Sequence, residues 1–454
     1  MRIPKLLLTG LVLGALLVSA VPVAAFGQPR VLLSRGRTEP VVAVGAGSAG
    51  TVLVGANTNY NSPINGTFPV AYFASHDAGR HFVAGSVPVL APYTTGADPT
   101  VAIAPSGTIF YLYLGETPAY CSGGRSAVLM STSTNGGRSF GSPVVIDANS
   151  ADDKPNFAIT SSPGKPSHLF VTWTRWYDHG SDIWYSRSLD GGHHFSPAVK
   201  LYGSGLDNFG STPVFGPYGH VHVFWSIFGE RGLYAVTSTA IVERVSVNGG
   251  ASFGRLRSTV PSFSGIPRMA QPGSLRNLTA PAVAVTRHGD LILAYASVQR
   301  NRGQGVVDAN INVSRSRNDG RSWARPVAVN DVYTGDRFMP AIAALPDGSV
   351  GIAFYDRRSS PDNLSVIAVH VVWHNGVHRS RNIQVNRLLA PVNDIFYIKP
   401  GSTCFSPGRF FGDYIGAASM MSDRLAVTWA DTGLRVPSET DVWFASVAMP
   451  AVSR

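Results

Sequence analysis

An eight-residue phrase that returns five times is the feature that most constrains the fold of this chain. It reads Ser, any residue, Asp or Asn, any residue, Gly, two further residues, then Phe or Trp. The copies begin at Ser75, Ser133, Ser188, Ser246 and Ser316, so that they stand 58, 55, 58 and 70 residues apart. A nearly constant period of this length predicts one supersecondary unit that is copied and stacked along the chain.

The phrase itself predicts a tight β-hairpin turn. Its glycine stands where the turn requires φ > 0, a conformation that glycine reaches without a steric penalty. The Ser hydroxyl and the Asp or Asn side chain can accept hydrogen bonds from the N–H groups of the turn. The closing aromatic residue then anchors the hairpin to an apolar surface. The glycines are Gly79, Gly137, Gly192, Gly250 and Gly320.

A second repeated pattern precedes the eight-residue phrase in each unit. Each unit begins with a residue followed by proline, which suits the first position of a strand. In the five complete units the proline stands 33 to 35 residues before the Ser of the phrase, and a sixth unit ends in a worn copy at His374–His378. The six pairs are Glu39-Pro40, Asp98-Pro99, Lys154-Pro155, Thr212-Pro213, Ala280-Pro281 and Met339-Pro340.

These repeats predict an all-β protein, a β-propeller of four-stranded antiparallel blades. After the sixth unit, residues 412–432 form one more apolar hairpin, and Asp441–Val447 supplies another strand. Seven blades result if the early strand Arg30–Arg35 completes the last unit and closes the ring, which removes exposed sheet edges. Six blades are the alternative if the terminal units merge. No segment has a sustained apolar period of 3.6 residues, so we expect little helix.

The N-terminus has the pattern of a secretory leader. Arg2 and Lys5 precede the apolar run Leu6–Val21, and Val23–Ala25 offers small residues for cleavage. We therefore expect a signal peptide at 1–25, a single propeller domain at 26–454, and an exported, extracellular or periplasmic monomer; a retained signal anchor is the alternative. No later apolar run is long enough to span a bilayer. Cys121 and Cys404, an even pair in an exported chain, are candidates for a disulfide.

The charge of the chain is carried mainly by arginine. The net charge is +10, and only five of the 37 basic residues are lysines. A guanidinium is a planar fork that suits carboxylate, sulfate or phosphate, which favours an acidic ligand; a genome that prefers arginine codons is the alternative. Because the arginines are scattered and form no stripe or basic helix, we do not expect a nucleic-acid partner.

The eight-residue phrase resembles the Asp-box, or bacterial neuraminidase repeat, and the chain is similar over nearly all of its mature length to the sialidase-like propeller superfamily. This resemblance implies a propeller that acts on or binds glycans. In a sialidase of this superfamily, three arginines clamp the sugar carboxylate, a Tyr beside a Glu attacks the anomeric carbon, and an Asp serves as acid and base. The family's first arginine lies in Phe/Tyr-Arg-Ile-Pro, where this chain has Arg37-Thr38-Glu39-Pro40.

The candidate site residues follow from propeller connectivity. The loops that enter each innermost strand, and those between the second and third strands, meet on one face around the axis, and they bring arginines, carboxylates and aromatic rings together. The strand entries also supply Asp153 and Lys154. The catalytic candidates are Tyr414, Tyr355, Asp98 and Glu116, and the ligand-binding candidates are Arg175, Trp176, Arg231, Arg337, Asp356, Arg357, Arg358 and Asp413.

Every one of these residues also has a purely structural interpretation. An Asp at a strand entry often binds the N–H groups of its own loop, and Arg357 or Arg358 can simply neutralise Asp356. Two hypotheses therefore stand: a glycoside hydrolase of sialidase type, acting on acidic sugars, and a non-catalytic propeller that binds a glycan or a protein at the cell surface.

Metal ligands form a minor signal. Asp152 and Asp153 are candidate oxygen ligands for calcium. His220 and His222 are two apart on a predicted strand and share a face, but the sequence near them supplies no third ligand for zinc. No cofactor is expected.

Overall fold

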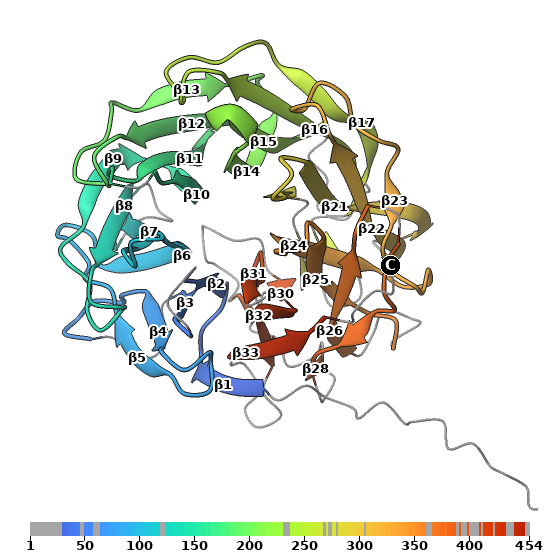
Figure 1. Cartoon of the computed structure of the whole chain (residues 1–454), viewed down its shortest axis with the longest axis horizontal. Helices are drawn as coiled ribbons and strands as arrows, with labels where there is room; N and C mark the ends of the chain where they lie inside the picture. Colours follow the sequence, from blue (N-terminus) through green and yellow to red (C-terminus); the bar gives the residue numbers. More distant parts are fainter. Residues whose placement is uncertain are drawn as a thin grey trace, which may run out of the picture.

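The chain folds into a ring of seven four-stranded antiparallel sheets (Figure 1). The computed structural model describes residues 30–45, 50–57, 64–118, 124–162, 164–229, 237–266, 269–270, 275–277, 280–303, 306–359, 366–376, 378–386, 390–391, 397–398, 408–409, 412–420, 423–432 and 440–449. The fold is therefore the predicted all-β propeller, and the number of blades is seven rather than six.

Each of the first six sheets is built from strands that follow one another in the chain, with the first strand nearest the axis. The first sheet holds β2 (Val41–Val44), β3 (Val52–Ala56), β4 (Ala71–Ser75) and β5 (Val83–Ser86); the second holds β6 (Thr95–Ile103), β7 (Ile109–Glu116), β8 (Ser126–Ser133) and β9 (Val144–Ser150). The third holds β10 (Asp152–Thr160), β11 (His168–Tyr177), β12 (Gly180–Ser188) and β13 (Val199–Tyr202); the fourth holds β14 (Asp207–Phe215), β15 (Val221–Phe228), β16 (Thr237–Ser246) and β17 (Arg257–Gly265).

The second half of the ring follows the same plan. The fifth sheet holds β20 (Ala282–Val285), β21 (Leu291–Gly303), β22 (Val306–Ser316) and β23 (Val327–Ala328). The sixth holds β24 (Arg337–Ala344), β25 (Val350–Asp356), β26 (Val366–His374) and β27 (Ile383–Gln384), with β28 (Ala390–Pro391) also paired to β26. The seventh holds β31 (Gly416–Met420), β32 (Arg424–Thr432), β33 (Thr440–Ala448) and, at its outer edge, β1 (Arg30–Arg35), which pairs with β33.

Two long loops form a small extra sheet. It contains β18 (Met269–Ala270) and β19 (Leu275–Arg276), which precede the fifth sheet, and β29 (Tyr397–Ile398) and β30 (Gly408–Arg409), which precede the seventh. Both loops lead into innermost strands, so they leave from the same edge of the ring as the strand entries. A 3-10 turn lies at Pro217–Gly219, and within the described ranges no helix has the length and apolar character needed to cross a bilayer.

The repeated phrase forms the turn that its sequence predicts. In the first copy the Ser75 hydroxyl accepts a hydrogen bond from the Gly79 N–H (2.9 Å), and Asp77 accepts from the N–H of Arg80 and of His81 (both 3.0 Å). The same bond from glycine N–H to Ser hydroxyl recurs in the other four copies. All five glycines have positive φ, between 71° and 86°, so the predicted geometry is confirmed.

The innermost strands carry a recurring bulge at the residue–proline pair. Pairing skips two residues at Asp98-Pro99 in β6, at Lys154-Pro155 in β10 and at Met339-Pro340 in β24. The strands therefore begin earlier than predicted, and each of these prolines occupies a bulge, where its missing N–H is tolerated. The residue before proline has positive φ in each of them, with values of 50°, 47° and 49°. In this conformation the side chain does not follow the pattern of the strand, in which successive side chains point to opposite faces of the sheet.

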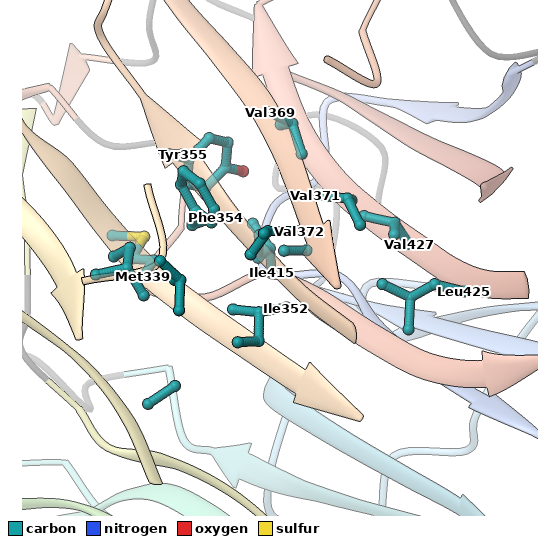
Figure 2. Close-up of a cluster of buried hydrophobic side chains, with 14 of the residues drawn as sticks. Met339, Ile352, Phe354, Tyr355, Val369, Val371, Val372, Ile415, Leu425 and Val427 are labelled. Carbon is teal, nitrogen blue, oxygen red and sulfur yellow. The ribbon is translucent and has the colours of Figure 1, made fainter. Parts of the chain in front are cut away.

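The core consists of apolar layers between neighbouring sheets. The largest layer includes residues of the fifth, sixth and seventh sheets. Figure 2 shows part of it, where Ile352, Phe354 and Tyr355 of β25 lie with Leu425 and Val427 of β32. Because both faces of each sheet are covered by its neighbours, the central strands are continuous apolar runs rather than alternating ones.

Candidate functional site

Lys154 lies at the centre of a buried cluster of charges where the innermost strands meet. Its ammonium group contacts Glu39 Oε1 at 2.6 Å, Asp98 Oδ1 at 2.7 Å and Asp413 Oδ2 at 3.0 Å. These partners come from the entries of the first, second and seventh sheets, while Lys154 belongs to the third. The four side chains are between 2% and 10% exposed. Burial disfavours the charged amine, but the three carboxylates outweigh it and raise the pKa of Lys154 well above its usual value.

Glu39 is tied into the cluster from both sides. Its carboxyl group accepts hydrogen bonds from the Asn57 side-chain amide and from the Asp413 N–H, the latter at 3.1 Å. Burial, which outweighs the attraction of Lys154, raises the pKa of Glu39 well above its usual value. Asn57 also accepts a hydrogen bond from the Asp98 N–H at 2.7 Å. Burial thus acts against a negative charge on Glu39, whereas the Lys154 ammonium group acts in its favour.

Asp98 and Asp153 form a pair of carboxyl groups with opposite pKa shifts. Burial favours the protonated form of Asp98, but Lys154 and hydrogen bonds from Glu39 and Asp153 hold its pKa well below the usual value. Burial and the neighbouring Asp98 charge raise the pKa of Asp153 to about 7. The Trp176 indole N–H donates to Asp153 Oδ2 at 2.8 Å and fixes this carboxyl group. One carboxylate and one carboxylic acid thus stand side by side near neutral pH.

Glu116 and Tyr414 border this pair. Burial, followed by the charges of Asp98 and Asp153, raises the pKa of Glu116 to about 8. The Tyr414 ring lies 5.1 Å from Lys154 Nζ, and its hydroxyl donates to the Pro99 carbonyl at 3.3 Å. Burial and the surrounding carboxylates raise the pKa of Tyr414 well above its usual value, so that its hydroxyl stays protonated.

The arrangement has two layers. Lys154, Glu39, Asp98 and Asp413 form a buried floor, and we call these four residues the axial cluster. Half-buried side chains lie against this floor, namely Asp153, Glu116, Tyr414 and Trp176. Such a site offers an acid, a carboxylate beside it and two flat aromatic faces. These groups can donate a proton, stabilise positive charge and stack on the apolar face of a sugar.

The predicted arginines do not join the axial cluster within the described residues. Arg175 binds Asp152 through Nε at 2.7 Å, binds Asp147 through Nη2, and lies over the Trp184 ring at 4.2 Å. Its guanidinium therefore ties the second sheet to the third. The predicted ligand contact of Arg175 is replaced by these internal partners.

A second group of predicted ligand-binding residues forms ion pairs in the sixth sheet. Arg337 and Asp356, both fully buried, lie 3.3 Å apart, and Arg358 binds Asp356 at 2.6 Å and Asp331 at 2.5 Å. Arg357 is also fully buried, 3.5 Å from Asp336. Arg337, Asp356 and Arg357 are thus fully buried, and their charges are paired within the sixth sheet: Arg337 with Asp356, and Arg357 with Asp336. The structural interpretation holds for them.

Tyr355, one of the four catalytic candidates, belongs to the buried core. It is 1% exposed and lies in the apolar core that Figure 2 shows. Its hydroxyl donates to the Ala430 carbonyl at 2.8 Å and accepts from the Ala430 N–H at 3.1 Å. A hydroxyl so bonded to the backbone of the next sheet is a packing element and no nucleophile. Arg231, Cys121 and Cys404 lie outside the described residues.

The structure thus brings together Asp98, Asp413, Tyr414, Glu116 and Trp176 from the predicted set. Glu39 and Asn57 were missed as site residues, and Lys154 was expected at the face without its central role. A signal for Glu39 was present, because it stands before proline in the same repeat position as Asp98 and Lys154.

Comparisons with known proteins give fold likenesses only. No family model matches the chain, and no curated protein matches it. Solved structures that are similar include a protein of unknown function from Dyadobacter fermentans (12% identity, TM-score 0.47, 92% of this chain and 98% of that chain). They also include the Hadza microbial sialidase Hz136 (12%, 0.46, 88% and 76%) and a GH93 α-L-arabinofuranosidase of Fusarium graminearum (12%, 0.46, 74% and 93%). At these values the likenesses carry no argument about activity, and the fold rests on the sheet order.

Proposed function

We propose that this chain is a glycan-acting propeller that hydrolyses a glycosidic bond at the axial cluster. Asp153 is the general acid that protonates the leaving oxygen as the glycosidic C–O bond breaks, and the Asp98 carboxylate stabilises the positive charge that develops on the sugar ring. Water then adds to the anomeric carbon and returns a proton to the Asp153 carboxylate. The observation that carries the proposal is the Asp98–Asp153 pair, in which neighbouring carboxyl groups have their pKa values driven apart. Such pairs mark acid and carboxylate roles in glycosidases.

The electrostatics of the site favour a neutral sugar over an acidic one. Three carboxyl groups surround Lys154, and Asp153 and Glu116 add two more. Arg175, Arg337 and Arg358, which were expected to bind a sugar carboxylate, are paired with aspartates. An anionic sugar would meet like charge here, whereas hydroxyl groups would find acceptors. Trp176 and Tyr414 supply the flat faces for the ring.

The test is a panel of fluorogenic glycosides, neutral pyranosides and furanosides together with a sialoside. The variants are Asp153→Asn and a matched control, Asp347→Asn, which lies in the turn between β24 and β25 at the opposite edge of the ring. We expect the wild type and Asp347→Asn to release fluorophore from a neutral glycoside, and Asp153→Asn to be about 10²–10⁴-fold slower. Equal rates in the two variants, or release from the sialoside alone, would contradict this assignment.

A second candidate function is glycan binding without hydrolysis. It is favoured by the low exposure of the axial cluster, whose four side chains lock one another in place. A glycan array probed with the wild type and with Asp153→Asn separates the two functions. Binding by both proteins, with no release of fluorophore from any glycoside, would establish the non-catalytic function.

The proposal includes export of the protein as a monomer with one domain over 26–454. It is supported by the leader pattern at 1–25. N-terminal sequencing of protein secreted by a host, and light scattering on the purified material, test these two points. A mature chain that still begins at Met1, or a stable dimer, would overturn the corresponding part.

A further inference from the structure

His220, His222 and Asp319 meet at the edge of the ring opposite the strand entries. The two histidines flank Val221 at the start of β15 in the fourth sheet and share one face. Asp319 comes from the fifth copy of the repeated phrase, in the neighbouring sheet, 99 residues beyond His220. His220 Nδ1 lies 2.7 Å from Asp319 Oδ2, and His222 Nε2 lies 2.9 Å from Asp319 Oδ1. The third ligand that the local sequence lacks is thus supplied by another blade.

The three residues offer ligand atoms that all lie within 4.8 Å of one another. Two imidazole nitrogens and a carboxylate are ligands typical of zinc and of other divalent first-row metals, whereas calcium and magnesium prefer oxygen alone. With bonds of about 2.0–2.1 Å from zinc to nitrogen and oxygen, neighbouring ligand atoms stand about 3.3 Å apart. The two separations between histidine nitrogen and Asp319 oxygen, 2.7 and 2.9 Å, need to open by only about half an ångström.

Glu243 gives a second, independent indication. It lies on β16, is fully buried, and places Oε2 3.5 Å from His222 Nδ1. Within the part of the chain that the structure describes, neither of its carboxylate oxygens has a hydrogen-bond partner, and the nearest cation, Arg257, is 3.7 Å away. A metal on Nε2 would leave the proton of His222 on Nδ1, facing this carboxylate. Metal-binding histidines are characteristically oriented by such an outer carboxylate.

Gly216 keeps the space beside these ligand atoms open. A Cβ at this position would lie 2.8 Å from His222 Nε2 and 3.6 Å from Asp319 Oδ1. The backbone at Gly216 has φ −83°, which any residue adopts. The backbone conformation therefore does not require glycine at this position. The lack of room for a Cβ beside His222 requires it.

We propose that His220, His222 and Asp319 bind one divalent transition metal, with zinc as the preferred ion, and that the metal fastens the fourth sheet to the fifth. Glu243 acts as the positioning residue for His222. The site stands apart from the axial cluster and does not depend on the function proposed there. Its expected effect is on the stability of the ring, because a ligand that binds only the folded state raises its stability.

The test uses the full chain, stripped with a chelator and then titrated with zinc by calorimetry and followed by thermal unfolding. The variant is His220→Gln, chosen because this side chain is 20% exposed and its loss leaves the core intact. The matched control is His194→Gln. His194 makes the same hydrogen bond to an aspartate of the phrase, Asp190, at 2.6 Å, but it is 89% exposed, and among the described residues no second histidine is hydrogen-bonded to that aspartate.

We expect one zinc ion per chain for the wild type and for His194→Gln, with a rise in melting temperature on addition of the metal. His220→Gln should bind zinc at least about 10–100-fold more weakly and lose that rise, while its circular dichroism stays that of the wild type. Gly216→Ala, folded by the same criterion, should also lose tight binding. No stoichiometric zinc in the wild type, or equal affinity in His220→Gln, would overturn the proposal and leave the three residues as a hydrogen-bonded clasp.

Discussion

Removal of the Lys154 charge is the sharpest test of the axial cluster. Lys154→Met keeps the length of the aliphatic stem and deletes the ammonium group that contacts Glu39, Asp98 and Asp413 at 2.6–3.0 Å. Burial raises the pKa of Glu39, and the variant leaves this group, Asp98 and Asp413 without their shared counterion. Breaking a buried ion pair from one side costs about 3–5 kcal/mol, and we expect a loss of unfolding free energy of that size at pH 8.

The loss of unfolding free energy in Lys154→Met should depend on pH. In the wild type Lys154 holds the pKa of Asp98 low, so the stability that Asp98 contributes is present above its unfolded pKa and is lost as the pH falls. In Lys154→Met burial has no opposing cation and the pKa of Asp98 rises. The variant then recovers stability when its carboxylates take up protons. Its deficit relative to the wild type should therefore be larger at pH 8 than at pH 5.

Urea unfolding of both proteins at the two pH values measures this difference, with Lys200→Met as the matched control. Lys200 pairs with Asp182 at 3.3 Å, but its side chain is 55% exposed. An exposed pair of this kind contributes about 0–1 kcal/mol. If Lys154→Met costs no more than Lys200→Met, or if its deficit is the same at pH 5 and pH 8, the axial cluster is not held by the charge of Lys154.

Three further predictions concern single groups. Ser75→Ala removes the acceptor for the buried Gly79 N–H, and chemical denaturation should show a loss of about 1–3 kcal/mol. Tyr355→Phe deletes a hydroxyl bonded twice to the neighbouring sheet, so it should cost a comparable free energy of unfolding and leave glycosidase rates unchanged. Tyr414→Ala removes a ring proposed to stack on the sugar and should lower the glycosidase rate; equal rates in the two variants would refute the assignment. Because Asp153 acts as an acid with a pKa of about 7, glycosidase activity should fall as the pH rises through about 7, and a rate that instead rises there would exclude the role.

Almost all of the fold could be predicted from the repeats, because the residues of each repeat determine its local geometry. The turn beginning at Ser75 needs a glycine at positive φ and a hydroxyl acceptor, and all five copies of the phrase supply both. The residue–proline pairs located the innermost strands, although Pro99 and Pro155 proved to lie in bulges inside their strands. Local requirements of this kind are readable without any knowledge of distant contacts.

The site was only partly predictable, because charge pairing depends on which side chains meet across blades. Arg337 and Arg358 looked like forks for an acidic ligand, yet they bind Asp356. Nothing in the local sequence distinguishes an arginine that neutralises an aspartate from one that awaits a substrate. The contact of Glu39 with Lys154 joins the first sheet to the third, and the sequence around either residue does not indicate it.

The positive φ of the residue before proline recurs from sheet to sheet near the axis, whereas the side chain at this position differs between sheets. Glu39, Asp98 and Lys154 precede proline with φ of 53°, 50° and 47°, and Met339 does so with φ of 49°. Met339 is 4% exposed and packs in the apolar core. Since the same conformation serves an apolar side chain in the sixth sheet, strain at these positions does not by itself identify a functional residue. The choice of charged side chains in the seventh, first, second and third sheets does.

This placement also couples the site to the completion of the ring. The Asp413 N–H donates to Glu39 across 374 residues of sequence, and both carboxyl groups contact Lys154. The first and the seventh sheets must therefore be adjacent before the axial cluster can form. A local opening between them would separate Lys154 from two of its three partners and leave buried charge unbalanced, so that the ion pairs that build the site also penalise the opening of the ring.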